Sequence, residues 1–186
     1  MIEVENDIKL DFGCGPKCKK DFYGVDIRQC KGVKYLCNSW EIHNHVKLNS
    51  VSEIYSRHFL EHLNFKQFKE TILSWKKILI PNGRIEVIVP DINYHINQFL
   101  NLDWEDTAQF SSKCKVINHA LAGFWGWQRG GLEDEWDVHK SGYNFKLLKI
   151  KLEENSFCDI EKIKDKPWNL HITAKIKNNR KTYKGE

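Results

Sequence analysis

The chain has 186 residues, a length that favours one domain closed around a single core. Its hydrophobic content of 41% and charged content of 29% are those of an ordinary globular protein, and its net charge of +4 does not demand a nucleic-acid partner. No apolar run reaches the length of about eighteen residues that a membrane span requires, and the N-terminus lacks the features of a signal peptide. We therefore expect a cytoplasmic protein, with one domain over residues 1–178 and a disordered tail at 179–186.

Six cysteines raise the question of a metal site or of disulfides. Their spacing argues against zinc, because Cys14 and Cys18 have no second pair at zinc-knuckle distance. Reduced thiols in a reducing compartment are the better interpretation.

The first two predicted strands carry the strongest local signal in the chain. An apolar strand over residues 8–12 leads directly into Gly13 and Gly15, and a second short strand, 22–27, ends near the carboxylate of Asp26. This is the layout of a nucleoside site at the carboxyl ends of parallel strands. The glycines let a ligand approach the backbone closely, and the acid can accept hydrogen bonds from a ribose diol.

The same residues indicate which nucleoside fits. A dinucleotide-binding fingerprint needs a third glycine where Cys18 stands and an acid about 20 residues further on, whereas Asp26 follows Gly15 much sooner. The Gly-Lys-Ser/Thr of a phosphate loop is also absent. Asp11, just before the glycines, repels a pyrophosphate but suits a cationic amino group. S-adenosylmethionine combines an adenosine ribose with an ammonium and a sulfonium, so it is the predicted ligand.

At this point the sequence resembles the class I, Rossmann-like S-adenosylmethionine-dependent methyltransferases. Their first motif is an acid followed by Gly-x-Gly, and their second is an acid that ends strand two. The passage Leu79-Ile80-Pro81-Asn82-Gly83-Arg84 is similar to their Leu-x-Pro-Gly-Gly turn. More narrowly, His58-Phe59-Leu60-Glu61-His62 looks like the His-x-x-Glu-His segment of the small type 11-like methyltransferases, often predicted to act in surface polysaccharide synthesis.

The resemblance implies an α/β fold, a Rossmann-like three-layer sandwich. Its seven-stranded sheet is mostly parallel, has the order 3-2-1-4-5-7-6 and contains an antiparallel last strand. It also implies that Asp26 binds the ribose, that Asp11 and the glycine turn hold the methionine end, and that Asn38 and its neighbours contact adenine. The implied cofactor-binding residues are Asp11, Gly13, Cys14, Gly15, Asp26, Ile27, Asn38, Ser39 and His58.

Two features depart from the family. The segment between the first two strands leaves room for a turn or two of helix at most. Asn38, at the end of a predicted strand over residues 34–37, stands where relatives often carry an acid, although an amide can make the same bond to adenine. Trp40 can either stack on adenine or pack against a helix.

Further along, residues 51–59 are predicted as strand four, whose end the family places beside the reacting methyl group. Asn64 and Gln67 predict a capping box. The helix that follows has a hydrophobic stripe consisting of Phe65, Phe68, Ile72, Trp75 and Leu79. A turn at 81–83 and a strand at 84–89 come next.

The second half of the chain is less regular. A helix is predicted from Pro90-Asp91, a ragged helical pattern covers residues 103–118, and residues 124–131 look irregular. Asn144 is predicted to cap a helix that ends near Asn155. Strands at 157–163 and 169–177 complete the sheet.

Three histidines compete for a catalytic role. Transfer of a methyl group to a hydroxyl benefits from a general base, and His58, His62 and His139 are the candidates. Each could instead be satisfied by a backbone carbonyl. A metal site made of the three is conceivable, but we expect no metal. Because residues 56–59 lack the Asp/Asn-Pro-Pro-aromatic motif of enzymes that methylate nucleic-acid amines, such a substrate is disfavoured.

An aromatic, lid-like insertion is predicted over about residues 103–143. Its residues Trp125, Trp127, Arg129, Trp136 and Tyr143 could form a sugar-binding platform, the core of a lid or a homodimer contact. We therefore predict an enzyme that methylates a hydroxyl group of a small molecule or a glycan. Two alternatives stay open: an inactive methyltransferase-like binding or partner subunit, and an enzyme that cleaves S-adenosylmethionine.

Overall fold

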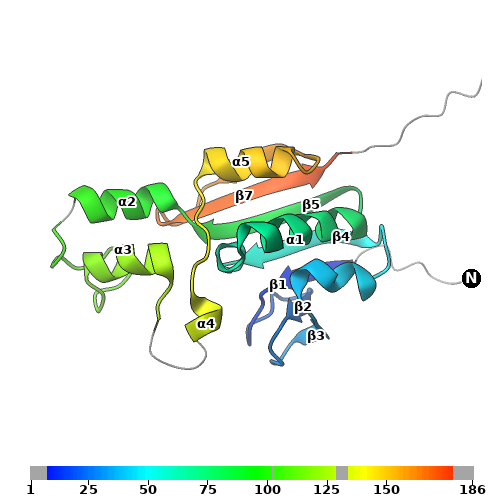
Figure 1. Cartoon of the computed structure of the whole chain (residues 1–186), viewed down its shortest axis with the longest axis horizontal. Coiled ribbons are helices and arrows are strands. Elements are labelled where there is room, and N and C mark those ends of the chain that lie inside the picture. The colour runs from blue at the N-terminus through cyan, green and yellow to red at the C-terminus, as the bar shows by residue number, and fades with distance from the viewer. Residues whose placement is uncertain (1–7, 102, 129–133, 178–186) are drawn as a thin grey trace, which may run out of the picture.

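A computed structural model describes residues 8–101, 103–128 and 134–177 of the chain. Its centre is a seven-stranded sheet with the order β3-β2-β1-β4-β5-β7-β6 (Figure 1). The first five strands of this order are parallel, and β7 runs antiparallel to both β5 and β6. The strands are β1 (Ile8–Phe12), β2 (Tyr23–Asp26), β3 (Val33–Leu36), β4 (Val51–Arg57), β5 (Leu79–Pro90), β6 (Phe157–Ile163) and β7 (Asn169–Ile176). The predicted fold class and strand order are confirmed.

The helices fall into two groups. In Figure 1, η1, α1 and α5 lie across one face of the sheet, whereas α2, α3 and α4 gather beyond the end where the parallel strands finish. The helices are η1 (Ser39–Asn44), η2 (Leu60–His62), α1 (Phe65–Ile78), α2 (Ile92–Asn101), α3 (Val116–Trp125), α4 (Asp134–Asp137) and α5 (Phe145–Glu153). None of the helices in the described ranges is long and apolar enough to cross a membrane.

Helix α1 supplies much of the core. The predicted capping box is present, because Asn64 Oδ1 accepts from the Gln67 amide and Gln67 Oε1 accepts from the Asn64 amide. Trp75 is fully buried and its ring centroid lies 5.0 Å from that of Phe12 in β1. The buried stripe differs from the predicted one at its start, since Phe65 in the first helical position is exposed.

The opposite face of the sheet is polar around β1, β4 and β5. Because side chains alternate along a strand, Asp11 points away from the face that buries Phe12. Asp11 pairs with Tyr55 of β4, and Tyr55 pairs with Glu86 of β5, so the three residues form a row across the sheet. Lys19 ties this row together: its amide donates to Asp11 Oδ2 at 2.7 Å, and its Nζ lies 3.9 Å from the Tyr55 ring centroid and 3.0 Å from Glu86 Oε2. His171 Nε2 lies 3.1 Å from the other Glu86 oxygen. The segment that follows β1 is therefore held against the sheet by the contacts of Lys19, without a helix.

Several element boundaries differ from the prediction. The described residues between β1 and β2 form turns with no helix, which is shorter still than the turn or two expected. Strand β4 ends at Arg57 because His58 takes a left-handed backbone conformation, with φ of 50°. Strand β5 begins at Leu79 and continues through the predicted turn, where Asn82 has a φ of 63°.

The lid-like insertion is also organised differently. Helix α3 starts at Val116, so most of the predicted ragged helix at 103–118 is a series of turns with one bridge between Thr107 and Lys115. The same helix extends to Trp125, into the stretch expected to be irregular. The tail at 179–186 lies outside the described residues, and its disorder stays a prediction, as does the single domain over residues 1–178.

Candidate active site

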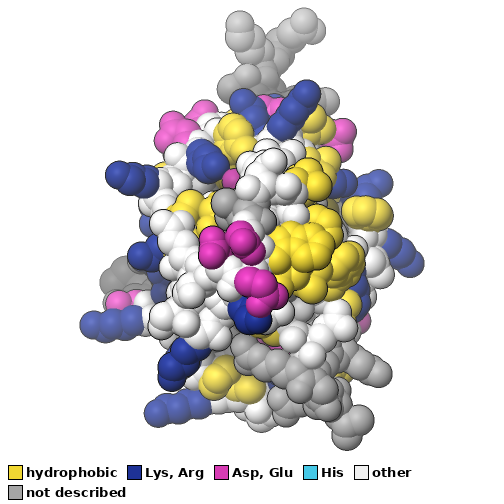
Figure 2. Space-filling view, turned by 90° about the vertical axis from the view of Figure 1, so that its left-hand side faces the viewer, with side chains coloured by type: hydrophobic (Ala, Val, Ile, Leu, Met, Phe, Trp, Pro, Cys, Tyr) yellow, Lys and Arg dark blue, Asp and Glu magenta, His cyan; other side chains and the backbone are white. Residues whose placement is uncertain are grey.

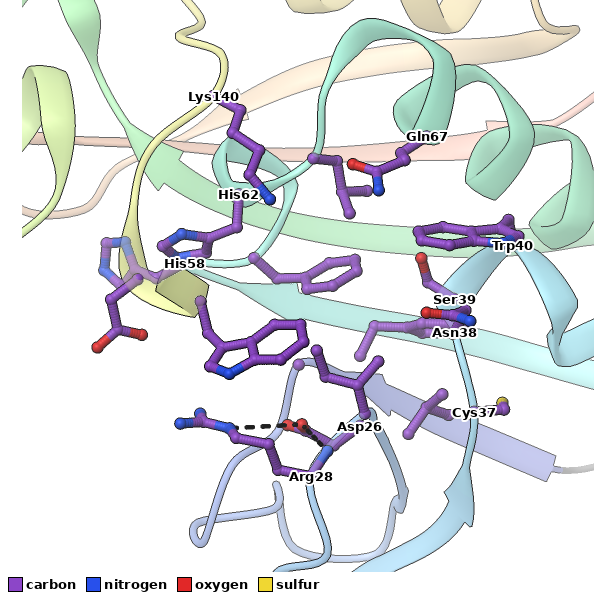
Figure 3. A pocket seen from close by; sticks show the side chains of 18 residues that line it. Asp26, Arg28, Cys37, Asn38, Ser39, Trp40, His58, His62, Gln67 and Lys140 are labelled. Carbon is purple, nitrogen blue, oxygen red and sulfur yellow. Dashed lines mark hydrogen bonds and ion pairs between the residues drawn. The ribbon is translucent and has the colours of Figure 1, made fainter. Parts of the chain in front are cut away.

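A cleft opens at the carboxyl ends of β1, β2, β3 and β4, and we call it the strand-tip cleft (Figure 3). Asp26 and Arg28 lie at its base, Asn38, Ser39 and Trp40 form one wall, and the opposite wall carries two histidines and a lysine. Its lining residues are Phe12, Gly13, Val25, Asp26, Ile27, Arg28, Cys37, Asn38, Ser39, Trp40, His58, Phe59, His62, Leu63, Gln67, Trp136, Asp137 and Lys140. Strand tips therefore supply one side of the cleft and connecting segments the other.

Asp26 is fixed by the backbone that surrounds it. Its Oδ2 accepts from the Gly15 amide at 2.9 Å, and its Oδ1 accepts from the Arg28 amide at 2.9 Å. The side chain is only 7% exposed, yet it borders the cleft. A carboxylate has about four lone-pair sites, so two remain for a ligand. The acid is thus oriented before any ligand binds.

The glycine turn closes against the segment after β4. Gly13 has a φ of 65°, and a Cβ at this position would lie 2.6 Å from the ring of Phe59. Gly15 also has a left-handed φ, of 52°, but nothing lies within 4 Å of the place where its Cβ would be. Glycine at 13 is therefore required by close approach as well as by conformation.

Three predicted cofactor residues do not line the strand-tip cleft. Asp11 belongs to the polar network on the other face, with its pKa raised by burial. Cys14 packs beside Gly24, and burial raises the pKa of its thiol to about 12, so the thiol stays neutral. Gly15 contributes its amide to Asp26. All six cysteines are free thiols.

The wall after β3 holds the residues predicted for adenine. Asn38 Nδ2 donates to Glu41 Oε2 at 2.9 Å, while Ser39 Oγ and Thr71 Oγ1 share a buried hydrogen bond of 2.7 Å. Trp40 lines the cleft and also packs against the core, and its stacking on adenine stays a prediction. Gly13, Asp26, Ile27, Asn38, Ser39 and His58 are the predicted cofactor residues that line the cleft.

His58 and Glu61 form a pair at the end of β4. His58 Nδ1 lies 3.3 Å from Glu61 Oε1, and Glu61 is only 1% exposed. Burial alone would raise the pKa of Glu61, but the imidazoles of His58, His62 and His139 outweigh this effect and hold the pKa below its usual value. A non-glycine residue with positive φ, such as His58, is a backbone outlier of the kind that clusters at functional sites.

His62 and His139 meet beside this pair. Their ring centroids are 5.0 Å apart, although the residues are far apart in the sequence. The segment after α4 is brought there by backbone hydrogen bonds: the Lys140 and Ser141 amides donate to the Glu61 carbonyl at 2.8 and 3.1 Å. Burial lowers the pKa of His139. All three predicted catalytic histidines therefore gather around Glu61.

A second cleft, which we call the histidine cleft, lies on the other side of these histidines. It is lined by His58, Glu61, His62, Pro90, His95, Phe110, His119, Ala122, Gly123, Trp127, Asp137, His139, Trp168 and Asn169. Gln98 bridges two of them, with Oε1 3.2 Å from His95 Nδ1 and Nε2 3.1 Å from His119 Nδ1. Burial lowers the pKa of both imidazoles to about 4, so they are neutral at physiological pH.

The described aromatic residues of the insertion do not all line the same cleft. Tyr143 is buried in the core beside Phe68, and Arg129 lies outside the described residues. Trp136 borders the strand-tip cleft, whereas Trp127 borders the histidine cleft. Figure 2 shows hydrophobic side chains gathered next to acidic ones on the end of the molecule that carries α2 and α3. A sugar platform, a lid core and a dimer contact all stay predictions.

Sequence reasoning missed several lining residues. Arg28 follows the strand-two acid by two positions and could have been inferred from it, as could Gln67 from its place in the capping box. Asp137 and Lys140 carry no local signal, and Trp136 was expected only as part of an aromatic insertion, because long-range contacts bring their segment to the clefts. Glu61 was part of a recognised segment, but its burial among three histidines appears only in the folded chain.

The sheet order and the position of the cleft define the class of fold. The chain has the Rossmann-like fold of class I S-adenosylmethionine-dependent methyltransferases. No family model and no curated protein sequence matches the chain. The assignment of the fold therefore rests on solved structures.

The similar structures include several methyltransferases. One from Archaeoglobus fulgidus has 18% identity and a TM-score of 0.59, covering 92% of this chain and 87% of its own. One from Mesorhizobium loti has 14% identity and a TM-score of 0.59, with coverage of 94% and 93%. The Burkholderia thailandensis 1,6-didemethyltoxoflavin-N1-methyltransferase, solved with its substrate and S-adenosylhomocysteine, has 14% identity and a TM-score of 0.55, with coverage of 91% and 71%. At these identities the likeness establishes the fold.

Proposed function

We propose that the protein is an S-adenosylmethionine-dependent methyltransferase that acts on a hydroxyl group of a small molecule or a glycan. The observation that carries this proposal is the placement of two groups on one cleft. Asp26 at the tip of β2 can bind a ribose, and His58 at the tip of β4 can take a proton. The methyltransferase fold of the chain supports the same conclusion.

The strand-tip cleft fits an adenosyl ligand. Phe12, Val25 and Leu63 give it apolar surface of the kind that an adenine ring buries, and Trp40 adds an aromatic side chain. Asp26 is a pre-oriented carboxylate with lone pairs left for a ribose diol. The absence of a Cβ at Gly13 lets Phe59 close over the turn. These residues would hold the cofactor.

The catalytic groups of the chain act mainly by position and by proton transfer. Bound S-adenosylmethionine supplies a methyl group on a sulfonium, and holding the acceptor in line with it provides much of the rate. Glu61 lies at Nδ1 of His58, which leaves the Nε2 of His58 to accept a proton. An acceptor hydroxyl bound beside His58 would give its proton to this Nε2 as its oxygen takes up the methyl group that the bound donor supplies.

We also propose that the protein works in the cytoplasm. The six cysteines are free thiols, as in a reducing compartment.

Calorimetric titration with S-adenosylmethionine and S-adenosylhomocysteine tests the proposal. We expect Asp26→Ala to weaken binding by roughly 1.5–3 kcal/mol, the scale of hydrogen bonds to a charged group. Asp26→Asn keeps one oxygen for the backbone amides, so it separates loss of the charge from disruption of the loop. Glu154→Ala, which removes an exposed carboxylate just after the end of α5, is the matched control.

Two outcomes would contradict the proposal. Wild-type protein that binds neither compound would favour a methyltransferase-like binding subunit. Consumption of S-adenosylmethionine without any acceptor, with the methyl group still on the released product, would point to an enzyme that cleaves the donor. Release of S-adenosylhomocysteine that depends on an added sugar or other hydroxyl acceptor is the expected result.

A further inference from the structure

We infer that Glu61, His62 and His139 form a binding site for a divalent transition-metal ion of the Zn²⁺ type. One ligand atom from each residue can be chosen so that all three lie within 4.8 Å of one another. Ligands about 2.0–2.1 Å from a tetrahedral Zn²⁺ stand roughly 3.4 Å apart, so small side-chain rotations complete the site. The inference differs from the sequence prediction of no metal, which weighed only a set of three histidines.

The backbone brings the three residues together independently of any ligand. Glu61 and His62 are neighbours in η2, which is anchored by the fully buried Leu60. The Glu61 carbonyl accepts the amides of Lys140 and Ser141, and this places His139 directly over η2. A site with such a preformed scaffold does not require the ion to order a loop.

Both imidazoles are held in the tautomer that a metal ligand needs. His62 Nδ1 lies 3.3 Å from the Val138 carbonyl, and His139 Nδ1 lies 3.0 Å from the Gly123 carbonyl. A carbonyl only accepts, so each Nδ1 carries the proton and each Nε2 keeps a free lone pair. Metal-bound histidines almost always donate their other ring N–H to a carbonyl or carboxylate in this way.

The burial of the Glu61 carboxylate is a second observation that indicates a ligand, independent of the two histidines. Its side chain is 1% exposed, and within the described residues neither carboxylate oxygen accepts a hydrogen bond of good geometry. The Nδ1 of His58 lies 3.3 Å from Oε1, so this imidazole can serve one oxygen and leaves Oε2 without a partner among the described residues. A buried carboxylate oxygen without a hydrogen bond is costly, and a divalent cation supplies the missing partner.

The donor set selects the kind of ion. Two imidazole nitrogens with one carboxylate oxygen suit Zn²⁺, Co²⁺ or Fe²⁺, whereas Mg²⁺ and Ca²⁺ prefer oxygen ligands throughout. Three protein ligands leave a position open for water or substrate. The thiols nearest the strand-tip cleft are held neutral by burial and lie in other segments.

The position of the site suggests its role. His58 and His62 line both clefts, so the ion would lie where the strand-tip cleft meets the histidine cleft. An acceptor hydroxyl close enough to give its proton to His58 would lie near such an ion, because His58 lines the same cleft as Glu61, His62 and His139. A bound cation polarises such an oxygen and eases loss of its proton. This catalytic role rests on the proposed function, whereas the ion site itself does not.

Titration of the chelator-treated full chain with Co²⁺, followed by visible absorption and by competition with Zn²⁺, tests the site. We expect one strongly absorbing Co²⁺ per chain, displaced by Zn²⁺. Glu61→Gln and His139→Gln should each weaken binding by more than about 100-fold, since losing an outer partner of a ligand alone costs 10–100-fold. His45→Gln, an exposed histidine near the end of η1, is the matched control and should bind like the wild type.

The outcomes separate the site from the proposed function. Absence of Co²⁺ binding, or equal binding by wild type and both variants, would overturn the ion site, and unchanged circular dichroism spectra show that the variants are folded. Equal rates of methyl transfer by metal-free and Zn²⁺-loaded protein would overturn the catalytic role alone. Loss of Co²⁺ binding in the variants of a protein that binds no S-adenosylmethionine would leave the site standing and remove the proposed function.

Discussion

The strand-tip cleft and the histidine cleft meet at His58 and His62 but are built in different ways. The base and one wall of the first come from the ends of β1, β2 and β3, which are held by parallel backbone pairing. The second is assembled from η2, α2, α3 and the segment after α4, joined by a few hydrogen bonds between distant loops. Loops placed on a rigid scaffold are where binding specificity usually varies. The strand-tip cleft, where we propose that the methyl donor binds, is thus fixed by the sheet, whereas the histidine cleft depends on long-range contacts.

Replacing His58 should have the largest effect, since this residue lines both clefts. We expect His58→Asn to lower the rate of methyl transfer by ~10²–10⁴-fold, the usual contribution of a general base. Affinity for S-adenosylhomocysteine should change little, because the proposed role of His58 is proton transfer. Single-turnover rates and calorimetry on the same variant measure the two effects. Equal losses of rate and affinity would show that His58 holds the donor instead.

Acidification should lower the stability of the fold through two buried histidines of the histidine cleft. Burial lowers the pKa of His95 and His119 to about 4, below the unfolded value of 6.5, so folding excludes protons from both. Their contribution to stability is complete above pH 6.5 and is lost as the pH falls toward 4. Because each pKa unit corresponds to about 1.4 kcal/mol, we expect a loss of about 3 kcal/mol for each of the two histidines.

Denaturant unfolding at several pH values measures this loss. Protonation of His119 at Nδ1 also removes the acceptor of the Gln98 amide, which couples the two histidines. The double variant His95→Gln/His119→Gln should flatten the dependence between pH 6.5 and 4. A slope that persists in the double variant would assign the loss to other groups.

Substitutions at the two glycines after β1 test how tightly the strand-tip cleft is built. Gly13→Ala places a Cβ against Phe59 and forces a left-handed alanine, so we expect a loss of about 2–3 kcal/mol in unfolding free energy together with weaker S-adenosylhomocysteine binding. Gly15→Ala has the same backbone strain in open space and should cost only about 1 kcal/mol. Thermal unfolding compares the pair. Equal costs would mean that the contact with Phe59 relaxes freely.

The smallest expected effect concerns the contact between η2 and the segment after α4. Ser141 Oγ lies 3.0 Å from the buried Tyr143 hydroxyl and 3.3 Å from the Leu60 carbonyl. Ser141→Ala should reduce stability by about 1 kcal/mol and weaken Co²⁺ binding by less than about tenfold, because the ligands themselves remain. Binding of S-adenosylhomocysteine should be unaffected. Ser112→Ala, an exposed serine, is the control, and weaker nucleoside binding in Ser141→Ala alone would show that the two clefts are coupled.

Much of the strand-tip cleft was predictable because its signals are local. Alternating apolar residues in β1, two glycines and an acid at the tip of the next strand specify a turn and a binding group within a short stretch of chain. The capping box of α1 is equally local, and both its hydrogen bonds are present. Asp11 shows the limit of this reasoning, since its neighbours in sequence suggested a ligand contact and its strand alternation turned it to the other face.

The family resemblance of the sequence predicted the fold class and the strand order, and local patterns predicted that glycine and acid gather at the ends of β1 and β2. Contacts between distant segments, which no local pattern reveals, bury Glu61 among three histidines, place Tyr143 in the core and bring the segment after α4 to both clefts. The difference arises from how far apart in the sequence the interacting residues lie. Strand alternation and turn conformation are set by neighbouring residues, whereas the position of His139 depends on two backbone hydrogen bonds to a carbonyl in another part of the chain.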